Sequence, residues 1–461
     1  MPLLHRFLAL WGSVLIGPDL LRCRQRRGHP LRPAPVADPR PRHHTVLCGL
    51  QPEQVDRPDH SHGALWPLLD GRQRRLSSMD TFDAKLHRSI AELDASLWQS
   101  CFDDSDPFLR WDFLHGLETS ACTTAESGWQ PAHITLEQSG TPVGVLPAYL
   151  KNHSYGEYVF DWSWADAWQR MGLRYYPKLV TAVPFTPASG RRLGDLTGDA
   201  DAPANMATCV KALSEELEIS SWHVLFLDEA TSEHLRRCEM PQRLTTQFHW
   251  FNREYRDFQD FLDRFSSRKR KNLRREREQI SRQGLSLKTL KGEAIGPEAW
   301  QFFHRCYQTT YAKRSGHGGY LTERFFTEAC PALGQVPVMV IAERDQQPVA
   351  ASLFFEGDDT LYGRYWGCLA EFEFLHFEAC YYRGIEYCIE AGLSRFDPGA
   401  QGEHKIQRGF EPILTYSNHW IVDERLREAV AQFAEQESQQ VRAYQRETAT
   451  LLPFKQESAQ P

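Results

Sequence analysis

The stretch Gly334-Gln-Val-Pro337, continued by Val338-Met-Val-Ile-Ala-Glu343 and Pro348-Val-Ala350, decides the fold, because the chain carries it twice. The earlier version is Gly128-Trp-Gln-Pro131, continued by His133-Ile-Thr-Leu-Glu137 and Pro142-Val-Gly144. The two align without a gap at an offset of 206 residues, as G-x-x-P-x5-E-x4-P-V. Self-similarity of this kind indicates one folding unit present twice.

Each copy predicts three antiparallel strands, a helix and one more strand. In the second copy we expect strands at 338–343, 348–355 and 361–368, separated by turns at 345–347 and 357–359. A helix then runs from about Glu373 to Ala391, where Gly392 caps it, and a short strand follows at 394–397. Tyr155-Gly-Glu-Tyr158 matches Tyr362-Gly-Arg-Tyr365 after a one-residue slip, which places both near the third strand. The predicted fold is α+β, with two tandem units of mixed, mostly antiparallel sheets flanked by helices.

A chain of 461 residues suits two domains. We expect a non-globular or mis-annotated extension at 1–78, a first domain at 79–243, a second at 244–425, and a C-terminal helix and tail at 426–461. The closing helix, from about Asp423 to Gln445, is polar except for Leu426, Val430 and Phe433 on one face.

The extension has its own composition, with 12 Arg, no Lys and 10 of the 27 prolines. Three interpretations stay open: a signal or transit peptide, a disordered Pro/Arg-rich tail, or upstream sequence preceding a true start at Met79. No stretch elsewhere reaches the ~18–20 apolar residues of a transmembrane helix.

Charge and cysteine usage exclude several classes of protein. The net charge is −7, but residues 79–461 alone carry −13, so this body does not bind nucleic acid by overall charge. The eleven cysteines form no C-x-x-C pair, which favours reduced thiols in the cytoplasm and gives no sign of a metal site.

Several strings resemble a bacterial N-acyltransferase family with tandem GNAT-like domains, the FemAB-like family of peptidoglycan biosynthesis or recognition. The strings lie within residues 95–445: His153-Ser-Tyr-Gly-Glu-Tyr-Val-Phe-Asp161-Trp, Tyr175-Tyr-Pro-Lys-Leu, Ser266-Ser-Arg-Lys-Arg-Lys-Asn272, Tyr362-Gly-Arg-Tyr-Trp-Gly367, Leu375-His-Phe-Glu378 and Gly399-Ala-Gln-Gly-Glu-His-Lys405. The resemblance implies acyl or aminoacyl transfer to the amine of a small molecule, peptide or cell-wall precursor. Acyl-CoA or aminoacyl-tRNA would be a co-substrate, no cofactor would be bound permanently, and tRNA would be a partner in the second case.

One segment departs from the acetyl-CoA-binding pattern of such folds, in which a glycine-rich loop before the central helix binds pyrophosphate. The second copy has Leu369-Ala-Glu-Phe-Glu-Phe-Leu375 there, with two acids and no glycine. The first copy offers only the partial match Gln169-Arg-Met-Gly172-Leu-Arg174. This favours an aminoacyl-tRNA or peptidyl donor over acyl-CoA in its usual pose.

Acyl transfer to an amine needs a base and donors for the developing oxyanion. The catalytic candidates are Glu378, Asp397 and His404. At 100° per residue Glu378 falls among apolar side chains beside Ile385, whereas His376 falls on the opposite face. A carboxylate facing a core is bonded, paired or protonated, so Glu378 is either catalytic or bonded internally, for example to Tyr365 or Arg364.

The loop Asp397–Lys405 supplies an acid, a base and a cation, with His404 as general base and Lys405 or Arg408 holding a phosphate or carboxylate; the alternative is a plain turn. In the first copy, polar side chains with nearby tryptophans form either a sugar- or peptide-binding wall or an ordinary core. The substrate-binding candidates are Arg364, Trp366, Gln401, Lys405, Arg408, His153, Tyr155, Glu157 and Asp161.

One dense basic patch stands out in the acidic body. Arg268, Lys269, Lys271 and Arg274 lie on a helix expected from near Tyr255 to Ile280. These cations could bind phosphates of tRNA, a nucleotide-linked precursor or CoA; the alternative is a solvated helix face.

Three hypotheses follow: a catalytic acyl- or aminoacyltransferase with its site between the copies, a non-catalytic recognition protein on a degenerate acyltransferase fold, and a tRNA-binding module without transfer activity. If Glu378 is catalytic, Glu378→Gln is expected to keep the fold and abolish transfer.

Overall fold

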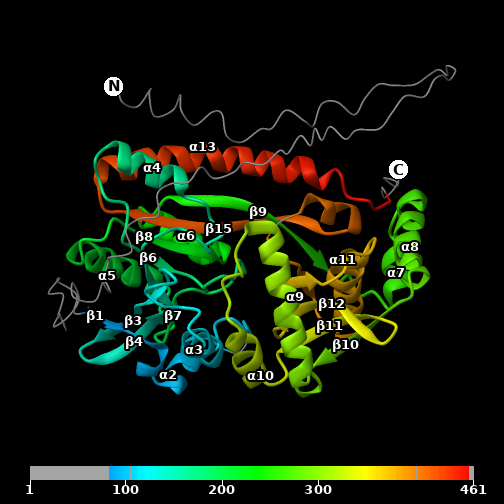
Figure 1. Cartoon of the computed structure of the whole chain (residues 1–461). Coiled ribbons are helices and arrows are strands. Elements are labelled where there is room, and N and C mark those ends of the chain that lie inside the picture. Colours follow the sequence, from blue (N-terminus) through cyan, green and yellow to red (C-terminus); the bar gives the residue numbers. More distant parts are fainter. Residues whose placement is uncertain (1–81, 104, 401, 456–461) are drawn as a thin grey trace, which may run out of the picture. The chain divides into compact units, whose positions relative to one another are not determined.

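The computed structural model describes residues 82–103, 105–400 and 402–455. The predictions for residues 1–78 and for Gln401 lie outside these described residues. In Figure 1 the described strands gather into sheets with helices packed against them.

The first half runs from β1 to β9. Its elements are β1 (Phe82–His87), η3 (Ile90–Glu92), α2 (Ala95–Cys101), α3 (Trp111–Thr119), β2 (Gln130–Pro131), β3 (His133–Gln138), β4 (Thr141–Leu146), β5 (Ala148–Lys151), α4 (Trp162–Arg170), β6 (Lys178–Thr181), β7 (Gly194–Asp195), α5 (Ala202–Glu216), β8 (Ser221–Leu227), α6 (Glu229–Arg237) and β9 (Gln242–Phe251).

The second half runs from α7 to α13. Its elements are α7 (Phe258–Asp263), α8 (Ser267–Arg282), β10 (Leu285–Lys291), η4 (Gly292–Ala294), α9 (Pro297–Ser315), η5 (Phe325–Ala329), α10 (Cys330–Ala332), β11 (Pro337–Arg344), β12 (Gln347–Glu356), β13 (Thr360–Cys368), α11 (Leu375–Phe377), η6 (Glu378–Tyr382), α12 (Arg383–Ala391), β14 (Arg395–Asp397), η7 (Glu403–Arg408), β15 (Glu411–Ile421) and α13 (Glu424–Ala449).

The repeated sequence forms the same hairpin in both halves. The register of β3–β4 shifts between Leu136 and Glu137, and that of β11–β12 shifts between Ala342 and Glu343. These bulges lie 206 residues apart, which is the offset of the sequence repeat. Both two-residue turns, 139–140 and 345–346, have positive φ angles, which matches the twist of a tight hairpin. The duplication is therefore present in the structure as well as in the sequence.

The two halves share one sheet because they exchange their last strands. The order of the eleven-stranded sheet is β10-β11-β12-β13-β14-β9-β15-β8-β6-β5-β2. Strand β9 of the first half pairs with β14 of the second, and β15 of the second pairs with β8 of the first. At the centre Thr245 of β9 faces Thr415 of β15, with their hydroxyl oxygens 2.5 Å apart.

Strand directions repeat on either side of these threonines. The β13–β14 and β6–β8 pairs are both parallel, whereas β14–β9 and β8–β15 are both antiparallel. A pseudo-twofold axis between Thr245 and Thr415 therefore relates the halves, and the predicted α+β fold with tandem GNAT-like units is confirmed. The predicted boundary at 243/244 falls within β9, and the domain limits stay a prediction.

Two details of the predicted elements are wrong. Residues 155–158, which the repeat placed near the third strand of the first copy, form a loop between β5 and α4. The third strand of that copy is β6, which pairs with β5. The helix expected from Tyr255 to Ile280 is two helices, α7 and α8, separated at residues 264–266. Helix α8 begins directly after Ser266, a residue type that is more favourable at helix N-termini than in helix interiors, although its side chain makes no capping hydrogen bond.

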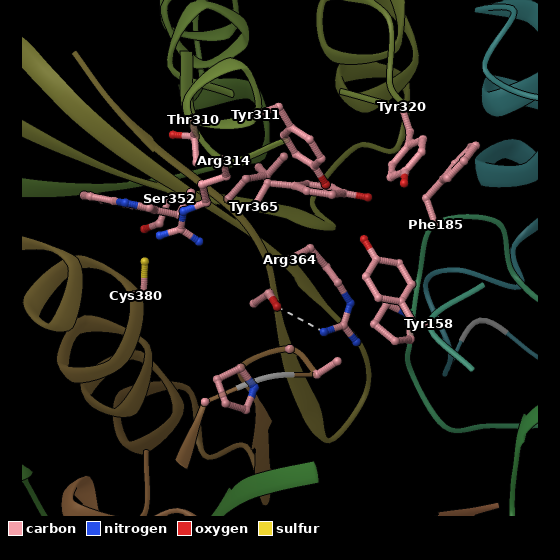
Figure 2. A pocket seen from close by; sticks show the side chains of 18 of the residues that line it. Tyr158, Phe185, Thr310, Tyr311, Arg314, Tyr320, Ser352, Arg364, Tyr365 and Cys380 are labelled. Atoms are coloured by element: carbon pink, nitrogen blue, oxygen red, sulfur yellow. Dashed lines mark hydrogen bonds between the residues drawn. The ribbon is translucent and has the colours of Figure 1, made fainter. Parts of the chain in front are cut away.

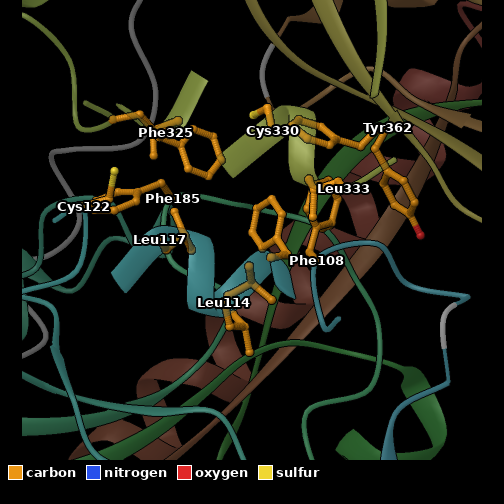
Figure 3. Packing of buried hydrophobic residues seen from close by; sticks show 14 of the residues in the cluster. Phe108, Leu114, Leu117, Cys122, Phe185, Phe325, Cys330, Leu333 and Tyr362 are labelled. Atoms are coloured by element: carbon orange, nitrogen blue, oxygen red, sulfur yellow. The ribbon is translucent and has the colours of Figure 1, made fainter. Parts of the chain in front are cut away.

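The main core joins the two halves. Phe108 packs its ring 5.4 Å from that of Phe355 and 5.1 Å from that of Tyr362, measured between ring centroids. Phe113 of α3 packs edge-on against Phe325 of η5 at 5.8 Å. Figure 3 shows Phe108 and Leu114 of the first half against Leu333 and Tyr362 of the second. Each buried ring stabilises the fold by roughly 1.5–3 kcal/mol, so the halves are held together hydrophobically.

The C-terminal helix α13 begins at Asp423, whose carboxylate accepts hydrogen bonds from the N–H groups of Arg425 and Leu426. It buries Leu426 and Val430 as predicted, and it packs along β9 and β15 (Figure 1). None of the helices among the described residues is both long enough and apolar enough to cross a membrane.

Candidate active site

A cavity of about 710 Å³ opens where β13 and β14 diverge. The two strands pair only from Thr360 to Tyr362, opposite Arg395 to Asp397. Pro398 follows and has no N–H with which to continue the ladder. The cavity walls come from β13, from the loop after β14, from α9 and, in the first half, from the loop before α4.

A β-bulge aims Arg364 into this opening. Leu353 of β12 pairs with Tyr365 and the next residue, Phe354, pairs with Gly363, so Arg364 is the extra residue of the bulge. Bulges redirect side chains, and they are common beside active sites. The adjacent Gly363 lets the strands come close, because an added Cβ there would meet Phe396 at 3.2 Å.

Arg364 and Asp397 form a buried ion pair at the base of the cavity. Arg364 Nη2 donates to Asp397 Oδ2 at 2.7 Å, and each side chain is 1% exposed. Although burial alone would raise the pKa of Asp397, the charge of Arg364 holds it well below its usual range. Arg364 Nε has no hydrogen-bond partner among the described residues, although it is buried beside the cavity. The pair therefore leaves one N–H of the guanidinium without a partner in the described protein.

Lys405 is the other buried cation of the cavity. It lies on η7, which follows Gly402, a residue whose φ of 115° suits only glycine. Lys405 Nζ donates to the carbonyl of Gly399 at 2.5 Å. Burial lowers the pKa of Lys405 to about 7, against the opposing charge of Asp397. A large share of Lys405 is therefore neutral near pH 7 and can accept a proton.

His404 is exposed at the mouth of the cavity, and its Nε2 lies 2.8 Å from the hydroxyl of Tyr381. Burial of part of the ring, with the charges of Lys405 and Arg408, lowers its pKa to about 4. His404 is therefore neutral at physiological pH but a weaker base than Lys405.

A π-helical turn shapes the cavity wall that follows β13. The turn η6 spans Glu378–Tyr382, and the carbonyl of Ala379 accepts a hydrogen bond from Ser352 Oγ at 2.8 Å. The extra residue in a π-turn rotates the helix face, and such turns are frequent at functional sites. His376 and Cys380 consequently line the cavity, so the predicted placement of His376 on the outer face is wrong.

Tyrosines form the far wall. Figure 2 shows Tyr158, Tyr311, Tyr320 and Tyr365 around one end of the cavity, with Arg364 between this end and the Ser352 side. Burial raises the pKa of each of these hydroxyls. Tyr158 has a φ of 61°, a strained conformation for a residue with a side chain.

The structure brings together only part of the predicted site. Arg364, Trp366, His404, Lys405 and Tyr155 line the cavity. Asp397 lies directly behind Arg364. The roles assigned to these residues remain predictions.

Glu378 is buried as predicted, but it does not line the cavity. Arg277 of α8 binds it with two hydrogen bonds, at 3.0 and 2.8 Å, and Arg383 Nε lies 3.2 Å away. Its partners are therefore not Tyr365 or Arg364. Arg408 likewise lies off the cavity, where it pairs with Glu276 at 2.9 Å and stacks on Phe377. Both geometries favour a structural role that docks α8.

The polar candidates of the first half belong to a buried network. Lys178 Nζ donates to Ser154, Glu157 and Asp161 at 2.8, 2.8 and 2.5 Å. His153 accepts a hydrogen bond from the N–H of Tyr155 at 3.2 Å. None of Glu157, Asp161 and His153 lines the cavity, whereas Ser154 and Tyr155 do. The network therefore anchors the loop that forms the first-half wall.

The equivalent opening in the first half, between β6 and β8, is filled by its own chain. Arg192 has a side chain with 0% exposure, and its Nε donates to the carbonyl of Leu225 in β8 at 3.1 Å. Its guanidinium also donates to the carbonyl of Ala188, in the segment after β6. Arg192 thus bridges the diverging strands where the second half leaves space.

The predicted phosphate-binding residues lie on α8, outside the cavity. Arg268 and Lys271 are exposed, Lys269 donates to Gln407, and Arg274 donates to Gln259 at 2.9 Å. Arg277 of the same helix binds Glu378 of η6, and other residues of η6 line the cavity. The basic surface of α8 is therefore connected to a wall of the cavity.

Sequence reasoning missed the cavity residues of α9 and of the segment after it. Thr310, Tyr311, Arg314 and Tyr320 come from outside the repeated hairpins. The tyrosines at 307, 311 and 320 were the only available signal, and helical spacing alone assigns them to a core.

A family model described as FemAB-like, peptidoglycan biosynthesis/recognition, matches residues 89–456. A search of curated proteins finds no match. Among solved structures, FemX has a TM-score of 0.47 at 10% identity, covering 76% of this chain and 100% of that chain.

L-PGS from Bacillus licheniformis has a TM-score of 0.41 at 10% identity, covering 69% of this chain and 94% of that chain. A tandem GNAT protein from the clavulanic acid biosynthesis pathway has a TM-score of 0.38 at 9% identity, covering 74% and 98%. Because these scores are below 0.5, the fold assignment depends on the strand order and register described above. The family match spans most of the sequence, and the chain belongs to the FemAB-like family of peptidoglycan biosynthesis and recognition proteins.

Proposed function

We propose that this chain is an N-acyltransferase that moves an acyl or aminoacyl group from an activated donor to an amine within the cavity between β13 and β14. The observation that carries the proposal is Lys405, a buried lysine whose pKa of about 7 makes it a base near neutral pH. It lies in one cavity with Arg364, whose buried Nε–H has no partner among the described residues.

The proposed reaction uses these two side chains in turn. The acceptor amine attacks the donor carbonyl carbon, a C–N bond forms, and the carbonyl oxygen becomes an oxyanion. Arg364 Nε–H donates to that oxyanion in a site shielded from water, where such a bond is strongest. Neutral Lys405 takes the proton released by the amine. The bond to the leaving thiolate or ribose oxygen then breaks, and the leaving group takes that proton from Lys405.

His404 has a supporting role in this scheme. With a pKa of about 4 it is neutral and less basic than Lys405, so the base assignment moves from His404 to Lys405. Its ring holds the Tyr381 hydroxyl at 2.8 Å, at the edge of the cavity. Asp397 keeps Arg364 in place through the 2.7 Å ion pair and does not need to exchange a proton.

Two features support an aminoacyl or peptidyl ester donor over acyl-CoA. Glu371 and Glu373 precede the helix that begins at Leu375, and their charges oppose a pyrophosphate at that helix end. The exposed cations Arg268 and Lys271 on α8 offer a surface for the phosphates of a tRNA. The acceptor in this proposal is an amine of a cell-wall precursor or peptide, at a site in the cytoplasm.

A ligand panel tests the proposal. The melting temperature of the full chain is measured with acyl-CoA, aminoacyl-tRNA, deacylated tRNA and a peptidoglycan precursor, each far above its dissociation constant. A ligand at 100 times that constant stabilises a fold by about 2.7 kcal/mol. We expect a donor to raise the melting temperature and its labelled acyl group to appear on an amine. A shift without any transfer would favour a recognition protein, and no shift at all would remove the enzyme proposal.

A further inference from the structure

The charges that line the cavity are unbalanced. Its cations are Arg314, Arg364 and Lys405, and His376 and His404 line it as well. No aspartate or glutamate lines it among the described residues. A cavity with cationic walls and no carboxylate attracts anions.

Two of the three cations are already accounted for. Arg364 is paired with Asp397 at 2.7 Å behind the cavity wall. Lys405 donates to the carbonyl of Gly399, and burial lowers its pKa to about 7. Arg314 has no hydrogen bond or ion pair within the described residues, so its charge is the one left unmatched.

Arg314 is exposed, but its side chain lines the cavity. It lies in the last turn of α9, which ends at Gly316 in the left-handed conformation. Figure 2 shows its side chain extending from α9 toward Ser352 and Cys380. Its charge contributes to lowering the pKa of His376 to about 3, after burial and the charge of His404. The neighbouring Lys313 instead pairs with Glu371 at 3.1 Å, outside the cavity lining.

We propose that Arg314 forms a binding site for an anionic group of the substrate, a carboxylate or a phosphate, with the hydroxyl of Thr310 in the same cavity wall. A guanidinium binds two oxygens of such a group through parallel N–H donors, and a hydroxyl such as that of Thr310 can add a third donor. Ser352 does not, because its hydroxyl already donates to the carbonyl of Ala379. The identification of this group as part of an acyl-transfer substrate rests on the proposed function. The site places the anion in the same cavity as Lys405, on a part of the substrate near the reacting bond.

Binding of two probe anions to the full chain tests this site without any transfer reaction. Inorganic phosphate and acetate are titrated separately at constant ionic strength, with chloride as the background, and the dissociation constants are measured by calorimetry. Wild type is compared with Arg314→Ala, with Arg314→Lys and with the matched control Lys313→Ala. We expect Arg314→Ala to weaken the preferred anion by about tenfold or more, the loss of one charge-assisted interaction.

The other variants separate charge from geometry. Lys313→Ala should bind like wild type, and Arg314→Lys should recover part of the affinity because it keeps the charge but not the fork. If phosphate binds and acetate does not, the anionic group of the substrate is assigned as a phosphate. If acetate binds and phosphate does not, it is assigned as a carboxylate. Equal binding by wild type and Arg314→Ala, or no binding of either anion to wild type, would overturn the inference. Transfer without anion binding would refute only this site, and anion binding without transfer would refute only the enzyme.

Discussion

Replacing Lys405 by methionine removes the buried amine at the centre of the proposed chemistry and leaves a side chain of similar length. Lys405 has a pKa of about 7 in the folded chain, against 10.5 for an ordinary lysine. Between these two values the unfolded chain binds more protons than the folded chain, so the stability contributed by this group rises with pH. Below pH 7 the folded chain must hold a buried ammonium, so the whole loss in the free energy of unfolding that this group causes is present there.

The size of this effect follows from the same two values. The full cost is about 5 kcal/mol, because each pKa unit corresponds to about 1.4 kcal/mol. About 3 kcal/mol of it remains near pH 8.5, where the folded amine is neutral but the unfolded one is still charged. The free energy of unfolding of wild type should therefore rise by about 2 kcal/mol between pH 6 and pH 8.5, relative to Lys405→Met.

Urea unfolding of both proteins near pH 6 and pH 8.5 measures this difference, and changes from other titrating groups cancel. Lys288→Met is the control, because Lys288 lies on β10 and pairs with Glu343 at 2.6 Å, outside the cavity. It should follow wild type in pH dependence. If wild type and Lys405→Met change in parallel, Lys405 has an ordinary pKa and the reasoning fails.

Three further predictions address the reaction, the docking of α8 and the central axis. The kcat/KM for transfer should rise with pH, and the midpoint of this rise should match the Lys405 pKa of about 7. Lys405→Arg should abolish the rise, and a flat wild-type profile would exclude Lys405 as the base. Glu378→Gln should lower the free energy of unfolding by roughly 1–2 kcal/mol, because it removes one of the two carboxylates that bind Arg277 and leaves only Glu386, at 2.6 Å, while the folded protein keeps its transfer rate; lost transfer at unchanged stability would restore Glu378 as catalytic. Thr245→Val should cost about 1 kcal/mol in thermal or urea unfolding by stranding the Thr415 hydroxyl, and adding Thr415→Val should recover part of it; additive losses would argue against the shared hydrogen bond.

Local features of the second copy were predictable from the sequence. Strands β11, β12 and β13, and the helix end at Gly392, follow from apolar runs bounded by turn residues and from a glycine in the left-handed conformation. The repeat also predicted equivalent hairpins, because the same residues specify the same register. Lys405 and Arg364 were chosen for their chemistry, and both line the cavity.

Other features depend on contacts that the sequence does not display. The exchange of β9 and β15 pairs strands about 170 residues apart, and no periodicity reports such pairing. The π-turn at Glu378–Tyr382 shifts the helix faces, so a constant 100° per residue placed His376 wrongly. Arg314 comes from α9, whose apolar and aromatic residues follow an ordinary core pattern.

Single-turnover transfer by Lys405→Met tests most directly whether the cavity between β13 and β14 performs the chemistry. A donor that raises the melting temperature is supplied with a radiolabelled acyl group, and labelled amine is counted for wild type, Lys405→Met and Lys288→Met. Loss of a general base slows a reaction by about 100-fold or more, so Lys405→Met should keep the donor-induced shift but transfer at least that much more slowly. Transfer by Lys405→Met at the wild-type rate would contradict the proposed site.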